Sequence, residues 1–232
     1  MKKLLSCVAF AVSLFGAGQA QAQYRERPFT WTGFYAGAHL GYAWGHADVS
    51  DTTGGVTPGP FGYSPRGAFL GGTAGYNWQF QSLVLGVEGD FGYMNLKGSG
   101  VIPSSNPAAH QDLTLDAGLY GVAAGRVGVA FGSTLLYGKG GFAYFGGKAS
   151  QTTTNPGYIT TPTGAFTGGA YGGGVEHFIS SSVSVKLEYL HFNFGSEGGL
   201  QTSISDPPVG YKYLNSTSLN ADTVKIGIAA HF

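Results

Sequence analysis

The chain has 232 residues, and its basic and acidic side chains balance to a formal charge of zero. Only 10% of its residues are charged, against the roughly 25% that is usual in soluble domains, while glycine supplies 41 residues and aromatic residues 14%. This balance lacks the basic footprint of a nucleic-acid-binding protein. Beyond residue 22, no apolar run reaches the length of about 18 residues that a membrane helix requires.

The first 22 residues have the features of an export signal that is removed from the mature protein. Two lysines give a positive start, a short apolar run follows, and Ala20 and Ala22 form an A-x-A cleavage site. We therefore expect a mature chain that begins at Gln23, with a short periplasmic lead over residues 23–30. The single cysteine lies inside the signal, so no disulfide is expected. The alternative for this segment is a buried amino-terminal helix.

From residue 31 onward, apolar and polar positions alternate in eight segments, which is the pattern of β-strands. The expected strands cover about residues 34–48, 66–80, 83–93, 113–130, 134–146, 164–178, 183–194 and 218–232. Short gaps follow the second, fourth and sixth segments, whereas long polar gaps follow the odd-numbered ones. This spacing predicts an up-and-down antiparallel meander with all of its long loops at one end.

A meander that crosses a membrane must close into a barrel, because lipid leaves no partner for an unpaired backbone group. Outer-membrane barrels have short periplasmic turns and longer outside loops. We therefore predict an all-β fold over residues 31–232, an eight-stranded antiparallel up-and-down transmembrane β-barrel. The turns expected in the periplasm lie near Gln81, Ser133 and Ser181. The loops expected outside the cell lie near Thr53, Ser104, Thr154 and Ser205.

Charged residues of the expected strands share one parity. In residues 83–93, LVLGVEGDFGY, carboxylates and glycines alternate with a mostly apolar stripe. If the stripe faces lipid, the charges face a lumen that eight strands leave just wide enough for side chains, and they must pair because unpaired buried charge is costly. The predicted lumen ion-pair network comprises Glu88, Asp90, Asp116, Arg126, Lys139, Glu176, Lys186, Glu188 and Lys225.

Within that network, Glu88 and Arg126 lie at similar distances from adjacent turns, which makes them expected partners. A catalytic acid/base pair of Glu88 and Asp90 is the alternative, but no nucleophile or substrate cleft accompanies them. Glycines of the same parity, such as Gly86 and Gly92, would make room for the long charged side chains.

Aromatic residues gather at the ends of the expected strands, as in the interfacial girdles of membrane barrels. Those near the turns are Phe34, Trp78 and Phe80, and those near the long loops are Trp44, Phe91, Tyr93 and Tyr144. A soluble lipocalin-type barrel would have the opposite polarity, apolar inside and charged outside. Parity alone does not separate the two barrels; the low charge and the girdles favour the membrane.

Six blocks of the sequence resemble the small outer-membrane β-barrel surface proteins of alpha-proteobacteria. The blocks are WTGFYAGAHLGYAWG, LVLGVEGDFGY, YGVAAGRVGVAFG, LLYGKGGFAYFGG, GVEHFISSSVSVKLEYLHFNFG and TVKIGIAAHF, which occur in this order over residues 31–232. The resemblance implies a location in the cell outer membrane of a Gram-negative bacterium. That family includes major antigens, proteins labelled porins and some hemin-binding members. Phe232 resembles the carboxy-terminal signal of the outer-membrane assembly machinery, which is then a partner together with outer-membrane lipid.

No enzymatic or metal-binding motif is apparent. The six histidines, at positions 39, 46, 110, 177, 191 and 231, have no metal-ligand spacing, and neither G-x-S-x-G, H-E-x-x-H nor a phosphate-binding loop occurs. We expect no enzyme activity, no cofactor and no metal. The expected function is structural, a barrel that displays four surface loops and supports envelope integrity. The alternatives are a small passive-diffusion porin and a surface protein whose loops bind hemin or a host ligand, or mediate adhesion.

Overall fold

The structure, a computed structural model, describes residues 30–51, 61–102, 111–153, 158–161, 164–203 and 212–232. The expected signal and the loop positions Thr53, Ser104, Thr154 and Ser205 lie outside these residues. In the part of the chain that is described, no helix is both long and apolar enough to cross a membrane.

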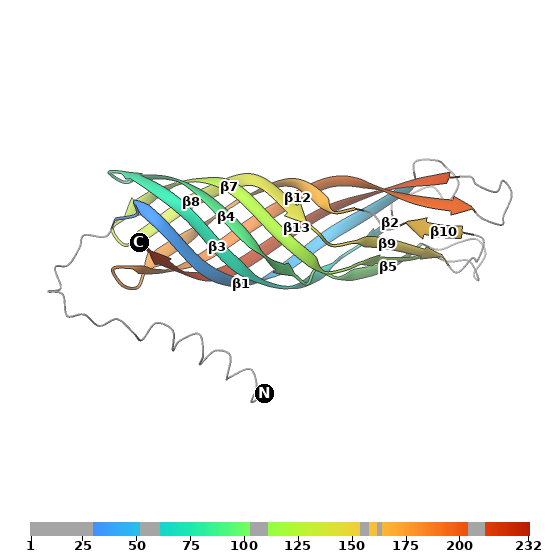
Figure 1. The fold of residues 1–232 in the computed structure, drawn as a ribbon, viewed down its shortest axis with the longest axis horizontal. Coiled ribbons are helices and arrows are strands. Elements are labelled where there is room, and N and C mark those ends of the chain that lie inside the picture. Colours follow the sequence, from blue (N-terminus) through green and yellow to red (C-terminus); the bar gives the residue numbers. More distant parts are fainter. Residues whose placement is uncertain (1–29, 52–60, 103–110, 154–157, 162–163, 204–211) are drawn as a thin grey trace, which may run out of the picture.

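Eight long strands pair antiparallel with their neighbours and close into a barrel (Figure 1). They are β1 (Gly33–Asp51), β3 (Arg66–Phe80), β4 (Leu83–Met94), β7 (Gly118–Phe131), β8 (Thr134–Phe145), β11 (Phe166–Phe178), β12 (Val183–Ser203) and β13 (Lys212–His231). Closure is made by β1 and β13, whose register runs from Tyr35 opposite His231 to Asp51 opposite Asn215. The predicted eight-stranded up-and-down barrel is therefore confirmed.

The polarity of the barrel is that of a membrane protein. Along β4, exposed residues such as Leu83 and Val87 alternate with buried ones that include Glu88 and Asp90. The seven predicted girdle aromatics are all exposed on the outer face, with exposed fractions from 41% for Tyr144 to 66% for Phe34. Because the outside is apolar and the inside holds the charges, the lipocalin-type alternative is wrong.

The short turns lie where the sequence places them. Two residues separate the end of β3 from Leu83, the first residue of β4. Two residues also separate the end of β7 from Thr134, the first residue of β8. Each turn contains one residue with a left-handed backbone, Gln81 with φ of 57° and Gly132 with φ of 62°. Glycine reaches this conformation without steric cost, so Gly132 suits its turn, whereas Gln81 is an uncommon residue for such a position.

The fourth predicted strand, residues 113–130, is interrupted in the structure. Its first part is β6 (Gln111–Leu115), and β7 starts only at Gly118. The two residues between them shift the alternation by one position, so Leu113 and Leu115 are buried while Leu119 is exposed. An unbroken strand over residues 113–130 would place these three leucines on one face, and this expectation is wrong because a one-residue slip moves every later side chain to the other face.

The long polar gaps contain more strand than the sequence predicts. Four further short strands are β2 (Phe61–Tyr63), β5 (Gly98–Ile102), β9 (Ala149–Thr153) and β10 (Tyr158–Thr161). Strands β5, β6 and β9 form a separate three-stranded sheet, and the β12–β13 ladder continues to Thr202 opposite Lys212. Paired backbone thus extends past the barrel at its loop end (Figure 1). The segments we expected to be loops are in part strand extensions, because open ladder ends can propagate pairing into Thr-rich sequence.

Candidate functional site in the barrel lumen

The lumen has three layers, and only the middle one is charged. A buried cluster at the turn end consists of Trp31, Val84, Ala130, Leu135, Tyr137 and Phe178. A larger buried cluster fills the loop end and includes Phe69, Met94, Leu115, Phe145, Phe166, Phe192, Phe194 and Leu219. The predicted polar interior therefore applies to the middle layer alone. The two apolar clusters close the lumen on both sides of the charges.

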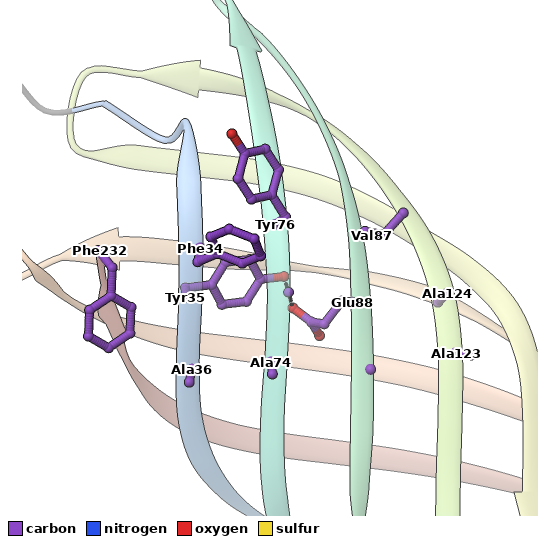
Figure 2. A pocket seen from close by; sticks show the side chains of 12 residues that line it. Phe34, Tyr35, Ala36, Ala74, Tyr76, Val87, Glu88, Ala123, Ala124 and Phe232 are labelled. Carbon is purple, nitrogen blue, oxygen red and sulfur yellow. Dashed lines mark hydrogen bonds between the residues drawn. The ribbon is translucent and has the colours of Figure 1, made fainter.

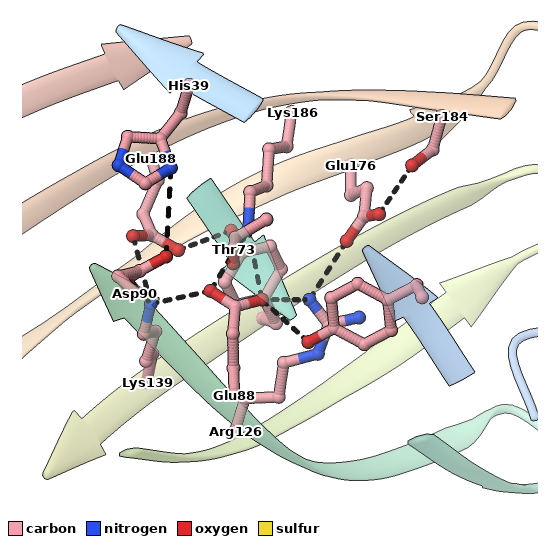
Figure 3. A network of polar contacts seen from close by, with 12 residues as sticks. His39, Thr73, Glu88, Asp90, Arg126, Lys139, Glu176, Ser184, Lys186 and Glu188 are labelled. Atoms are coloured by element: carbon pink, nitrogen blue, oxygen red, sulfur yellow. Dashed lines mark hydrogen bonds and ion pairs between the residues drawn. The ribbon is translucent and has the colours of Figure 1, made fainter. Parts of the chain in front are cut away.

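Eight of the nine residues predicted for the lumen network meet in one buried cluster. Figure 3 labels seven of them, all except Lys225. The carboxylates are Glu88, Asp90, Glu176 and Glu188, and the cations are Arg126, Lys139, Lys186 and Lys225. Formal charges in this set therefore cancel. This balance matters because each ion has been taken out of water, and only close partners of opposite charge offset that cost.

Lys139 lies at the centre of three carboxylates. Its Nζ is 2.6 Å from Glu88 Oε1, 2.5 Å from Asp90 Oδ2 and 3.4 Å from Glu188 Oε1. Oxygen atoms of these three acids converge closely enough for a metal ion, but the ammonium group takes the place of that cation here. Lys225 adds a second bridge, with its Nζ 2.7 Å from Asp90 Oδ2 and 2.8 Å from Glu188 Oε1.

Arg126 connects the middle of the network to its turn end. Its Nη1 is 2.9 Å from Glu176 Oε2 and 3.3 Å from Glu88 Oε2, and its Nε donates to Asn77 Oδ1 at 2.9 Å. The expected Glu88–Arg126 contact is therefore present, but Glu176 is the closer carboxylate. Lys186 also reaches Glu88, with Nζ 3.0 Å from Oε2.

Asp116 is the exception to the predicted network. It is exposed and lies in the two-residue break between β6 and β7, where its backbone N–H donates to Lys148 O at 3.0 Å. The prediction assumed that alternation continued unbroken from Leu113 to Ala130. Because the break shifts the parity, Asp116 does not reach the lumen.

Uncharged polar residues of the lumen complete the network, and sequence reasoning missed them. Tyr35 Oη donates to Glu88 Oε2 at 2.7 Å, and Tyr137 Oη donates to Glu188 Oε2 at 2.6 Å. The Arg126 guanidinium lies over both rings, 4.7 Å from the centroid of Tyr35 and 5.0 Å from that of Tyr137. His39 is also buried and hydrogen-bonds the Tyr120 hydroxyl. All of these lie on the face of their strand opposite the lipid-facing apolar stripe, which is the signal that could have found them.

Lumen glycines make room for the network. A Cβ on Gly86 would lie 2.3 Å from Asn77 Oδ1 and 3.2 Å from Arg126 Cγ, and a Cβ on Gly75 would lie 2.3 Å from Tyr35 Oη. The two contacts at 2.3 Å are sterically impossible unless the backbone or the neighbouring side chains move. The glycine content of these strands therefore follows in part from the size of the side chains that cross the lumen.

Ser184, His231 and Glu176 lie together on the side of the charged layer that faces the turns. Ser184 Oγ donates to Glu176 Oε1 at 2.6 Å, and His231 Nε2 is 2.9 Å from Ser184 Oγ and 3.2 Å from Glu176 Oε1. A catalytic triad needs the histidine to contact serine and acid through different ring nitrogens. Here one nitrogen contacts both, and Trp31 packs 5.8 Å from the His231 ring. The arrangement therefore closes the turn end of the barrel and is not a triad.

On the outer wall, a hollow of about 760 Å³ lies across β1, β3, β4 and β7 (Figure 2). Small side chains such as Ala36, Ala74 and Ala123 line it, with Phe34 and Tyr76 beside them. Glu88 contributes to the same stretch of wall, but its carboxylate points into the barrel toward Tyr35. The hollow is therefore an apolar depression in the lipid-facing surface, separate from the charged layer.

A closed barrel with an apolar outer face and aromatic residues at both ends defines a transmembrane β-barrel of the outer membrane. The family model for the outer membrane protein beta-barrel domain matches residues 8–232, so the chain belongs to this family. The protein is therefore located in the outer membrane of a Gram-negative bacterium, in contact with its lipid. The predicted location is confirmed.

Named relatives come from alpha-proteobacteria, as the resemblance predicts. The chain is 29% identical to the 25 kDa outer-membrane immunogenic protein of Brucella ovis over 185 residues, which cover 80% of this chain and 79% of the relative. It is 28% identical to the 31 kDa outer-membrane immunogenic protein of Brucella melitensis over 222 residues, which cover 88% and 85%. The crystal structure of OprG from Pseudomonas aeruginosa shares the fold, with a TM-score of 0.55 at 13% identity over 87% of this chain and 96% of that one.

Proposed function

We propose that this protein is a closed structural barrel that anchors surface segments in the outer membrane and supports envelope integrity, without enzyme activity. The observation that supports this proposal is a lumen filled with buried side chains. A charge-balanced layer of eight ionised side chains lies between two apolar clusters. A filled core suits an anchor, because the ion pairs and hydrogen bonds of a buried network hold its members in one arrangement.

Passive diffusion is the rival role, and the lumen contents argue against it. A hydrated solute would have to separate Lys139 from Glu88, two side chains with no exposed surface. It would also have to pass the aromatic residues of the loop end, among which Phe145 and Phe166 are completely buried. Diffusion porins have more strands and an aqueous channel.

Display of surface segments is supported by the strand extensions at the loop end. The β12–β13 ladder and the β5–β6–β9 sheet hold the bases of the long loops in paired structure. Two relatives are named as immunogenic, which fits a surface that antibodies can reach. We include the outer-membrane assembly machinery as a partner through Phe232, whose side chain is 81% exposed. Hemin or host binding stays a prediction, since the named loop positions lie outside the described residues.

Liposome swelling with the refolded mature chain tests the proposal. We expect no swelling in isotonic arabinose above that of empty liposomes, and no stable conductance steps in a planar bilayer. A diffusion porin reconstituted at the same protein-to-lipid ratio is the positive control. Sugar-size-dependent swelling by the wild-type chain would contradict the closed-barrel proposal and favour passive diffusion.

A further inference from the structure

A polar cluster lies on the outer face of β12 and β13, away from the lumen. His191 and Asp222 are directly opposite each other in the ladder, and His191 Nδ1 is 2.8 Å from Asp222 Oδ1. Tyr189 Oη donates to the same oxygen at 2.6 Å. The Tyr171 ring packs against the imidazole with centroids 5.1 Å apart. Two polar side chains thus converge on one carboxylate of the lipid-facing wall, and a tyrosine ring packs beside them.

This cluster lies at the loop-end aromatic girdle. Asp222 is opposite Trp44 in the β1–β13 ladder, and Trp44 is opposite Arg66 in the β1–β3 ladder. Such girdles mark the level of the lipid headgroups. Ionisable residues on the lipid-facing wall are costly within the hydrocarbon and usually functional, so a carboxylate here calls for a role at the headgroups.

The hydrogen bonds determine what the cluster can offer a headgroup. The Asp222 carboxylate accepts a hydrogen bond from Nδ1 of His191, so this ring nitrogen carries a proton. The other ring nitrogen, Nε2, remains as the second polar atom of the side chain. Among the described residues, none hydrogen-bonds Nε2, and the His191 side chain is 26% exposed. In a doubly protonated imidazole ring, Nε2–H is a hydrogen-bond donor. Two donors already occupy Asp222 Oδ1, which reduces the repulsion that this carboxylate would exert on an incoming anion.

We propose that His191, held by Asp222 and Tyr189, binds the phosphate of an outer-leaflet glycolipid. Imidazolium–phosphate hydrogen bonds are charge-assisted and stronger than neutral ones. Arg66, exposed on the other side of Trp44, places a second cation at the same girdle. Arg66 lies on β3 and His191 on β12, and these strands are three steps apart around the barrel wall. At the usual spacing of strands this separation is about 14 Å. The proposal adds a specific lipid to the general lipid contact of the barrel, and its test does not depend on whether the lumen conducts.

Native mass spectrometry of the refolded mature chain can measure this binding. The probes are lipid A with its phosphates and the same lipid after removal of the phosphates, so that the acyl chains are matched. We expect the wild type to retain the phosphorylated form preferentially, and His191→Ala to reduce its retention roughly two- to fivefold, as for loss of an exposed ion pair.

The matched control is His177→Ala. His177 is also exposed on the outer face, but it lies at the turn end with Nδ1 2.8 Å from Thr134 Oγ1. It should retain the lipid as the wild type does. Equal retention of the two lipids, or equal loss in the His191 and His177 variants, would overturn the proposal. Abolition of binding by a chelator would overturn it too, because it would assign the phosphate to a divalent cation on Asp222.

Discussion

Lys139 Nζ lies 2.6 Å from Glu88 Oε1, and neither side chain has exposed surface. Lys139 belongs to β8 and Glu88 to β4, two strands that are separated by β7. The contact therefore bridges over β7 on the inner side of the wall and ties together two strands that share no backbone hydrogen bonds. Four cations and four carboxylates extend this tie to β11, β12 and β13.

Removal of Glu88 should destabilise the barrel. Glu88→Ala leaves Lys139, Lys186 and Arg126 with one carboxylate fewer, and a broken buried pair costs roughly 3–5 kcal/mol. Some hydration of the lumen would bring the loss to the lower end of that range. Urea unfolding in lipid vesicles, followed by tryptophan fluorescence, should show a lower midpoint. The control is Ile226→Val, an exposed lipid-facing position that should change little. An unaltered midpoint together with an unaltered conductance would mean that Glu88 is solvated in an open channel.

Arg126 and Glu176 should be energetically coupled. Their 2.9 Å contact is buried on both sides, so either Arg126→Met or Glu176→Gln leaves an uncompensated partner. In the double variant neither charge remains, and its loss of stability should be smaller than the sum of the two single losses. Residues in one buried network show such coupling at about 0.5–3 kcal/mol. A double-mutant cycle on unfolding free energies provides the measurement, and strict additivity would show that the two groups do not interact.

Two glycines of β4 should respond differently to alanine. On Gly86 a Cβ would meet Asn77 Oδ1 at 2.3 Å, whereas on Gly89 the nearest atoms are 3.9 Å away. Gly86→Ala should therefore lower the free energy of unfolding by about 1–3 kcal/mol, as overpacking does. Gly89 faces lipid, so Gly89→Ala should leave the free energy of unfolding unchanged or raise it slightly, because alanine restricts the unfolded chain. Equal effects at both positions would contradict the tight packing around Asn77.

The orientation of the barrel can be tested by labelling on intact cells. We expect epitope tags near Thr53, Ser104, Thr154 and Ser205 to be reached by antibodies, and tags near Gln81, Ser133 and Ser181 to be protected. The reason is that long loops of outer-membrane barrels face outward and short turns face the periplasm. Permeabilised cells give the control for tag display at the protected sites. Labelling at Ser133 without labelling at Thr154 would invert the topology.

Much of the barrel is determined by the sequence alone. Alternation with period two specifies which residues of a strand share a face, so Glu88, Asp90 and Lys225 could be assigned to one side before any partner was known. The count of eight segments and the short gaps at Gln81 and Ser133 specify the meander. These features are local, because each depends on neighbouring residues and on turn geometry.

Tertiary structure alone decided which charges meet and how the lumen is filled. Lys139 and Glu88 are 51 positions apart and meet only when the strands have closed with their particular register. Parity also does not separate the charged layer from the apolar one, because Glu188 and Phe192 share one face of β12 and differ only in depth. Asp116 left the network because a break between β6 and β7 shifted the alternation, and such a break depends on pairing with β5 and β9. Register, depth and local slips arise from contacts between distant strands, which the order of residues along one strand does not contain.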